Sequence, residues 1–315
     1  MREMVLRRIA IGCATLWVVS VLVFAGTEIL PGDVAQIILG QSATPENLAT
    51  LRAELGLDKP APVRYFEWLG DMATGDLGIS KAGGATISSL IGERLANTLL
   101  LGAIVALIAV PLSVVLGLIA AMYPGTWVDR VLTFGTLSLV SVPEFFIATF
   151  LVLFLAVQWN LLPAIAYMSG TESFWQLMRA LAMPILTLVI VVAAQMIRMT
   201  RAGILNVMSS PYIEMAILKG IPRRRIILRH AFFNAIGPIV NVIALNLAYL
   251  VSGVVIVETI FAYPGLAKLM VDGVQTRDLP LVQACGMIFC GTYVVLILLA
   301  DIASILSNPR LRHPK

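Results

Sequence analysis

Charged residues are scarce in this sequence. They make up 13% of its 315 residues, whereas apolar residues make up 59%, and the mean hydropathy is +0.93. A soluble globular domain carries about 25% charged residues, so a chain with half that share cannot cover a surface that faces water. The composition therefore indicates an integral membrane protein, whose surface is solvated by lipid.

Cysteine and histidine are also rare. Cys13, Cys285 and Cys290 lie in apolar runs without CxxC spacing, which speaks against a disulfide framework and against a zinc site. With only His230 and His313 in the chain, a metal centre with histidine ligands is nearly excluded. The formal net charge of +4 is small, and we expect no nucleic-acid partner.

Motifs for covalent chemistry and for nucleotide binding are missing. The sequence contains no HExxH, no GxSxG, no GxGD in an apolar run and no phosphate-binding GxxxxGK[ST]. We therefore expect no catalytic residues, no metal site and no cofactor bound by this chain. Energy for any active process has to come from a partner.

Six apolar runs are long enough to cross a bilayer as helices, because about 20 apolar residues span its hydrocarbon core. A basic cluster of Arg2, Arg7 and Arg8 precedes the first run. That run is too long for the core of a signal peptide and no A-x-A site follows it, so we predict an uncleaved anchor. The predicted spans are residues 9–29, 99–122, 131–157, 177–197, 232–257 and 281–306.

Basic residues predict the orientation of these spans. With a cytoplasmic N-terminus, the inside segments hold 14 of the 22 Lys and Arg residues, and five of the other eight lie in one long outer loop, which weighs little in the positive-inside rule. Both termini are therefore predicted to be cytoplasmic. The 14 inside residues are Arg2, Arg7, Arg8, Arg130, Arg198, Arg201, Lys219, Arg223, Arg224, Arg225, Arg229, Arg310, Arg312 and Lys315.

The long outer loop, residues 31–96, has helical patterns of its own. Thr44 can cap a helix that begins at Pro45 and ends at Gly56. Residues 87–95 form a third stretch, which leads into the second span. We predict small interfacial helices that cover the outer mouth, with a solvated spacer as the alternative. The second stretch, residues 63–72, places four apolar side chains on one side: Tyr65, Phe66, Trp68 and Leu69.

Acidic residues and prolines interrupt the apolar runs. Acids in a membrane are functional candidates, but no facing set at mid-depth is evident, so structural pairing or exposure to a watery pore is favoured over proton coupling. The prolines are either hinges for alternating access or static bends. The acids are Glu28, Glu144, Glu258 and Asp301, and the prolines are Pro111, Pro143 and Pro184.

The segment between the fourth and fifth spans predicts two short helices joined by a turn. Ser209 or Ser210 can cap the first helix, Pro211 suits its first turn, and Glu214 stands where the helix dipole favours an acid. Gly220 tolerates a positive φ and ends this helix, and a proline opens the next one.

Both predicted helices have two distinct sides. The second, residues 223–230, is basic on one side and carries Ile226 and Ile227 on the other, which suits a membrane interface or an acidic partner. The alternative is that the loop is basic only to keep it on the cytoplasmic side of the membrane, but that role does not require the spacing between Glu214 and Gly220. On the first helix, a narrow ridge with small residues lets another surface approach closely: Ile213, Ala216, Ile217 and Gly220.

This segment resembles the EAA loop of ABC importer permeases, in which Glu-Ala-Ala is followed after three residues by Gly. Glu214 and Ala216 match, Met215 stands where the family has Ala, and Gly220 falls at the family spacing. Blocks along nearly the whole chain are similar to the first permease of dipeptide, oligopeptide and nickel importers. These blocks are Leu30-Pro-Gly-Asp33, Glu54-Leu-Gly-Leu57, Gly75-Asp-Leu-Gly78, Glu93-Arg-Leu95, Ser141-Val-Pro143, Leu161-Leu-Pro163, Glu258-Thr-Ile-Phe-Ala-Tyr-Pro-Gly265, Arg277-Asp278 and Asn308-Pro-Arg310.

The resemblance implies an all-α membrane protein with the type I ABC importer permease (MetI-like) fold. It has six transmembrane helices, both termini in the cytoplasm and a helical outer loop between helices 1 and 2, and lies in the inner (plasma) membrane. The chain then divides into residues 1–30 (tail and first helix), 31–96 (periplasmic helical loop), 97–306 (five-helix core with the coupling loop 201–231) and 307–315 (cytoplasmic tail).

The resemblance also implies how the chain works. In this family the loop docks in a groove of a cytoplasmic ATP-binding subunit, so the expected contacts are Glu214, Met215, Ala216, Gly220 and Arg223. The implied partners are a second similar permease, two subunits that bind ATP and Mg²⁺, a periplasmic or lipid-anchored solute-binding protein, and membrane lipid. The substrate stays open among dipeptides, oligopeptides, nickel, glutathione and opines. The alternative function is a secondary transporter driven by an ion gradient, and an intramembrane enzyme is disfavoured.

Overall fold

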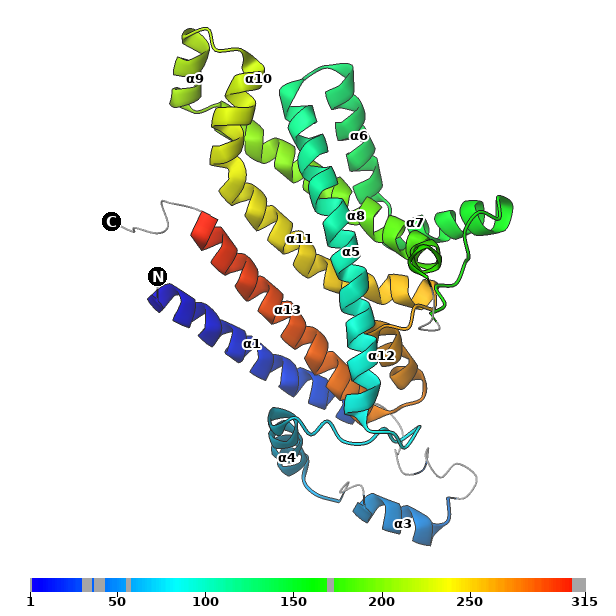
Figure 1. Ribbon diagram of the computed structural model, residues 1–315. Helices are drawn as coiled ribbons and strands as arrows, with labels where there is room; N and C mark the ends of the chain where they lie inside the picture. Colours follow the sequence, from blue (N-terminus) through cyan, green and yellow to red (C-terminus); the bar gives the residue numbers. More distant parts are fainter. Residues whose placement is uncertain (1, 30–35, 37–42, 55–57, 169–172, 308–315) are drawn as a thin grey trace. The chain divides into compact units, whose positions relative to one another are not determined.

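The computed structural model describes residues 2–29, 36, 43–54, 58–168 and 173–307. Within these ranges the chain is helical apart from turns, loops and one isolated bridge between Ile79 and Thr86, which confirms the all-α prediction there. The elements (Figure 1) are α1 (Arg2–Ile29), α3 (Pro45–Glu54), α4 (Ala61–Thr74), α5 (Ile87–Met122), α6 (Trp127–Ser141), α7 (Glu144–Leu151), the π-helical η2 (Val152–Gln158), α8 (Phe174–Met208), α9 (Pro211–Leu218), α10 (Arg223–Arg225), the π-helical η3 (Ile226–Ala231), α11 (Phe232–Ile260), α12 (Leu266–Gln275) and α13 (Leu279–Ser307).

Five helical segments of the described chain are long and apolar enough to cross a membrane, and a bent pair of helices adds a sixth if it counts as one span. The five coincide with five of the predicted spans. The second begins earlier than predicted, because residues 87–95 continue into α5 without a break. The segments are Leu6–Ile29, Ile87–Met122, Phe174–Met208, Arg223–Val251 and Leu279–Leu299.

The third predicted span is not one continuous helix. α6 ends at Ser141, α7 begins at Glu144, and the two helical segments meet at an angle of 100°. Pro143 has no N–H to donate, and it forces Val142 into an extended conformation with φ −93° and ψ 126°. The predicted third span, residues 131–157, is therefore broken at Pro143, one of the three prolines predicted to be hinges or static bends, whereas Pro111 and Pro184 lie inside the continuous helices α5 and α8.

The chain divides into two compact units, and unit 1 comprises residues 1–8, 98–264 and 295–315. Its central helix is α8. The rest of the protein buries 67% of the most apolar stretch of α8, compared with 22% of that of α5. α6, α7 and α11 pack against α8. α5 approaches it closely at Gly117, where a Cβ would lie 2.7 Å from Thr200 Cβ. The largest buried side chains of this core are Leu101, Leu181, Met183, Leu188, Met196, Phe261 and Tyr263.

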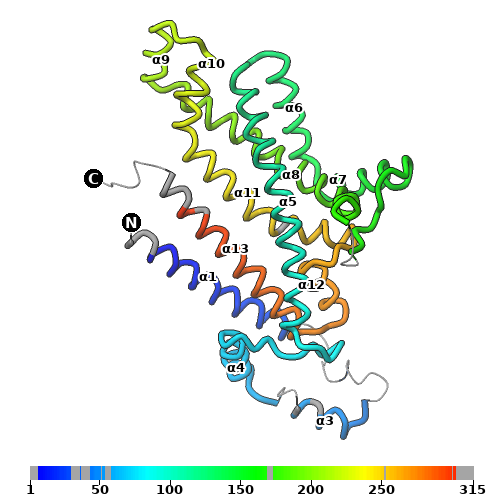
Figure 2. Tube along the Cα trace, viewed as in Figure 1, coloured from blue at the N-terminus to red at the C-terminus, as the bar shows by residue number. Residues whose placement is uncertain are grey.

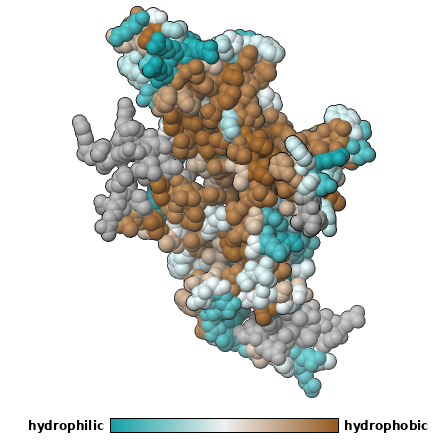
Figure 3. All heavy atoms as spheres, viewed as in Figure 1, coloured by the Kyte–Doolittle hydropathy of each residue, from teal (hydrophilic) through white to brown (hydrophobic). Residues whose placement is uncertain are grey.

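The outer surface of these helices is mostly apolar. Figure 3 shows hydrophobic side chains along the helices of unit 1 and hydrophilic ones gathered over α9 and α10. Large apolar side chains such as Leu107, Phe134 and Phe150 are exposed on α5, α6 and α7. A surface of this kind matches lipid rather than water.

Unit 2 comprises residues 9–97 and 265–294. Here α1 and α13 lie side by side (Figure 2), and Gln283 Nε2 donates to Thr27 Oγ1 at 2.6 Å. α4 packs on α1 through Tyr65, whose hydroxyl lies 2.8 Å from Ser20 Oγ. Trp68 and Leu69 are half-buried on the same side. Phe66 is 68% exposed, so its predicted place on that side is wrong: each residue turns the helix by about 100°.

Two further contacts order the outer loop within unit 2. The backbone N–H of Asn47 donates to Thr44 Oγ1 at 3.2 Å, which confirms the predicted cap of α3, whereas its predicted end at Gly56 lies outside the described residues. Asp278, before α13, is buried and accepts hydrogen bonds from Ser80 Oγ and from the Ala82 N–H. These bonds hold residues 80–82 against the start of α13.

Candidate functional site

A helical hairpin of residues 210–231 connects α8 to α11 (Figure 1). Pro211 is the first residue of α9, and Glu214 lies in its first turn. Ser210 stands at the N-cap, but its hydroxyl donates to the Val207 carbonyl at 2.6 Å, so the predicted side-chain cap is wrong. Gly220 has φ +73° and its N–H donates to the Ile217 carbonyl at 2.9 Å. The predicted pair of helices with a glycine turn is confirmed.

One side of the hairpin is built into the core of unit 1. Ile213, Ile226 and Ile227 are almost fully buried, and Ala216 packs against the same cluster. The predicted placement of Ile226 and Ile227 away from the basic side is thus confirmed. The predicted outward ridge is wrong at Ile213, because this side chain faces the chain's own helices.

Three long helices hold the hairpin in place. The buried cluster around Ile213 contains Ala121 of α5, Ile204 of α8, and Ala235 and Ile239 of α11. A fully buried core residue of this kind resists displacement, because moving it opens a cavity. A force applied to the hairpin is therefore passed on to α5, α8 and α11 together.

The other side of the hairpin carries the residues predicted to make contact. Glu214, Met215, Gly220 and Arg223 are exposed, and Ala216 is half-buried. Leu218 is 75% exposed beside Met215 at 55%. Three more exposed arginines extend the basic surface: Arg224, Arg225 and Arg229. Because charges at this density are costly in hydrocarbon, this side of the hairpin suits a surface that faces water.

A buried ion pair near the hairpin was missed by the sequence analysis. Asp129 at the start of α6 accepts from Arg201 of α8 at 2.6 Å (Nε) and 2.9 Å (Nη2). It also accepts from the Gly125 N–H at 2.8 Å, and its side chain is only 6% exposed. This bidentate ion pair, together with the hydrogen bond from the Gly125 N–H, fixes the α5–α6 turn to α8. The position of Asp129 in the first turn of α6 could have marked this acid as a candidate, but not its partner Arg201.

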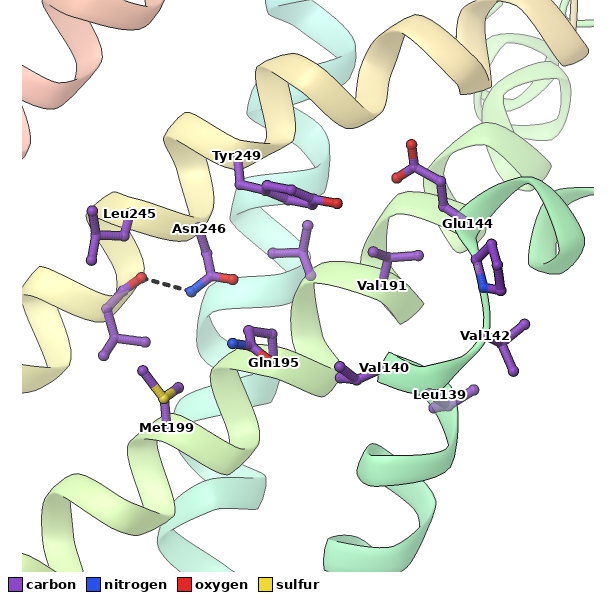
Figure 4. Close-up of a pocket in the computed structure, with 13 residues that line it drawn as sticks. Leu139, Val140, Val142, Glu144, Val191, Gln195, Met199, Leu245, Asn246 and Tyr249 are labelled. Atoms are coloured by element: carbon purple, nitrogen blue, oxygen red, sulfur yellow. Dashed lines mark hydrogen bonds between the residues drawn. The ribbon is translucent and has the colours of Figure 1, made fainter.

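A cavity of about 460 Å³ opens where α6 bends into α7. Its walls come from α6, α7, α8 and α11 (Figure 4). The polar side chains are Glu144, Gln195, Asn246 and Tyr249, and the remaining lining residues are Leu139, Val140, Val142, Pro143, Val191, Val192, Met199, Val242 and Leu245. Of this set, only the adjoining Val142, Pro143 and Glu144 stand out in the sequence, because the rotations of the helices cannot be predicted from it.

Three of the four membrane acids have partners within the chain. Glu28 pairs with Arg64, and Asp301 lies 2.9 Å from Arg8. Glu258 is fully buried and accepts from Thr98 Oγ1 at 2.6 Å. The predicted structural pairing is confirmed for these three. Glu144 differs, because its buried Oε2 has no hydrogen-bond partner among the described residues and, unlike Asp301, Glu144 has no ion pair there.

Known families and relatives match nearly the whole chain. Residues 113–313 match the family described as binding-protein-dependent transport system inner membrane component, and residues 1–102 match the N-terminal model of such membrane components. The chain is 36% identical to a permease of Sinorhizobium fredii named for peptide ABC transport, over 98% of this chain and 99% of the relative. It is 34% identical to a permease of Brucella abortus named for peptide transport (99% and 100% covered). It is 33% identical to the glutathione transport system permease protein of Shigella flexneri (99% and 100% covered).

Proposed function

Because the chain belongs to the family of binding-protein-dependent transport system inner membrane components, we propose that it forms half of the translocation pathway of an ATP-driven importer. Its relatives are permeases named for peptide and glutathione transport, so the proposed cargo is a peptide or a related small solute. The chain is the non-catalytic membrane subunit of such an importer. The ion-gradient alternative is not favoured by these relatives.

The observation that carries the proposal is the anchored hairpin. Its exposed side offers Glu214 and Met215 to a partner, while Ile213 and Ile226 on the other side lie in the core cluster with α8 and α11. A nucleotide-driven partner that moves this hairpin moves the ends of the membrane helices with it. We propose that Glu214, Met215, Ala216, Gly220 and Arg223 form this contact.

The remaining subunits follow from this role. We propose a second, similar permease, two cytoplasmic subunits that bind ATP and Mg²⁺, and a solute-binding protein, periplasmic or lipid-anchored, at the outer face. This chain itself would bind no cofactor. Its part is a conformational equilibrium that partners at both faces bias.

We further propose six spans with both termini in the cytoplasm. The Arg8–Asp301 ion pair supports this arrangement, because it joins the start of α1 to the last part of α13. The exposed arginines of the hairpin fit the cytoplasmic face. The bent pair of α6 with α7 and η2 would count as the third span.

The test is uptake by the assembled transporter in liposomes, with radiolabelled trialanine and glutathione as probes. Replacing Glu214 by Lys reverses the charge of the exposed contact surface without touching the core. We expect ATP-driven uptake to fall at least about tenfold, while the variant stays in the membrane and co-purifies with the second permease.

The matched control is Glu46→Lys, the same charge reversal at an exposed position of α3. It should leave uptake unchanged. Normal uptake by Glu214→Lys would contradict the coupling role. Uptake that needs no ATP and follows an imposed proton gradient would contradict the importer function itself.

A further inference from the structure

We infer that the cavity at the α6–α7 bend is a binding site for a protonated amino group, with Glu144 as its counter-ion. This inference deepens the proposed function, because it names the part of a peptide that the permease holds during passage: the amino terminus. It rests on that function for the identity of the cargo. The chemistry of the cavity itself can be tested separately.

The first argument is the charge of Glu144. Its Oε2 is buried, and neither an ion pair nor a hydrogen bond to this oxygen is found in the described part of the chain. An ionised carboxylate out of water is costly unless a cation offsets it. Glu28, Glu258 and Asp301 have found partners within the chain, which makes Glu144 the exception.

The second argument is that the fold makes room for this carboxylate. Gly253 of α11 faces it, and a Cβ at that position would lie 3.0 Å from Glu144 Oε2. The 100° bend at Pro143 turns the first residue of α7 toward α8 and α11. The carboxylate thus lies in the wall of the cavity, where Gly253 leaves room for it, rather than on a helix surface that faces lipid.

The third argument is the rest of the lining. Asn246 donates its amide N–H to the Val242 carbonyl at 2.8 Å, which turns its oxygen the other way, and the Tyr249 hydroxyl points toward Glu144 (Figure 4). These oxygens can accept hydrogen bonds from an ammonium group. Lys and Arg are absent from the residues that line the cavity. Arg198, outside this lining, donates to Gln195 Oε1 at 2.8 Å.

The fourth argument is size and access. A volume of about 460 Å³ is within the range of small-molecule sites. Leu245 and Tyr249 are 52% and 55% exposed, so the cavity is open on one side. Its apolar wall suits the side chain next to the amino group, with little selectivity among side chains.

The experiment measures the charge preference of the cavity in the assembled transporter in nanodiscs. The variant Leu245→Cys places a thiol on the cavity wall, in a background with Cys13, Cys285 and Cys290 replaced by Ala. We compare its modification rates with a cationic reagent, aminoethyl methanethiosulfonate, and an anionic one, sulfonatoethyl methanethiosulfonate. The cationic reagent should react faster, and Glu144→Gln should lower the ratio of the two rates about tenfold. Glu144→Asp should keep the ratio, as should the control Asp301→Asn outside the cavity.

Protection by peptides tests the ligand. Trialanine should slow the modification, N-acetyltrialanine should not, and Glu144→Gln should abolish the difference. Equal protection by both peptides, an unchanged rate ratio in Glu144→Gln, or a thiol that neither reagent reaches would each overturn the inference. Absence of ATP-driven uptake in the unmodified transporter would overturn the proposed function instead, so the two failures are distinguishable.

Discussion

Replacement of Asp129 by Asn should loosen the connection between the α5–α6 turn and α8. Asp129 accepts two hydrogen bonds from the guanidinium of Arg201 and one from the backbone N–H of Gly125. The amide of Asn keeps the size of the side chain but removes the charge, and its NH₂ group cannot accept from the guanidinium. Arg201 is then left partly buried without its counter-ion.

The expected loss of stability follows from the burial of the two partners. Breaking a buried ion pair on one side costs about 3–5 kcal/mol. Because the Arg201 side chain is 26% exposed and can turn toward water, we expect about 2–3 kcal/mol. In a chain of this size that corresponds to a melting temperature lower by roughly 3–5 °C.

The assay is thermal unfolding of the purified protein in detergent, followed by tryptophan fluorescence. The double variant Asp129→Asn with Arg201→Gln supplies the control, because neither partner is then left charged and alone. Its melting temperature should be close to that of the less stable single variant. Two results would refute the role of this ion pair in holding the α5–α6 turn to α8. One is that the stability losses of the two single variants simply add in the double variant, and the other is that Asp129→Asn is as stable as the original protein.

Three further changes have defined outcomes. Gly117→Ala puts a Cβ 2.7 Å from Thr200 Cβ and should cost about 1–3 kcal/mol in thermal unfolding; a change within error would show that α5 moves away easily. Gly220→Ala forces a side chain into φ +73° at about 1 kcal/mol, and should weaken the coupling of ATP hydrolysis to uptake, whereas Gly220→Asn should be milder. Burial, and then the charge of Glu258, raises the pKa of Tyr263. Stability should therefore fall as the pH rises above about 10, the pKa of an unfolded tyrosine, and Tyr263→Phe should remove this part of the pH dependence.

Most of the helical plan could be predicted from the sequence, because a run of about 20 apolar residues has few alternatives. The bend between α6 and α7 could not be fixed in the same way. Pro111 and Pro184 lie in apolar runs like Pro143, yet their helices continue. Whether a proline bends or breaks a helix depends on neighbours that re-satisfy the backbone, and these are set by the tertiary structure.

The hairpin shows a similar limit. Its turn was predicted from Gly220 and the residues around it, which act locally. The inward side of α9 was not, because Ile213 and Ile217 are both isoleucines, four residues apart, and only the position of α8 and α11 decides that Ile213 is the buried one. The pairing of Asp129 with Arg201 joins positions 72 residues apart, and no local pattern reports such a contact.

The bend at Pro143 also restricts how the protein can be turned within the bilayer. α6 ends at Ser141, and the last carbonyl groups of any helix lack partners inside it. Hydrocarbon offers no hydrogen bonds to such groups, so non-helical backbone at this depth has to be covered by protein or bathed in water. Val142 and Pro143 border the cavity, so this edge has to face water or protein, and the exposed aliphatic surfaces elsewhere are left for the lipid.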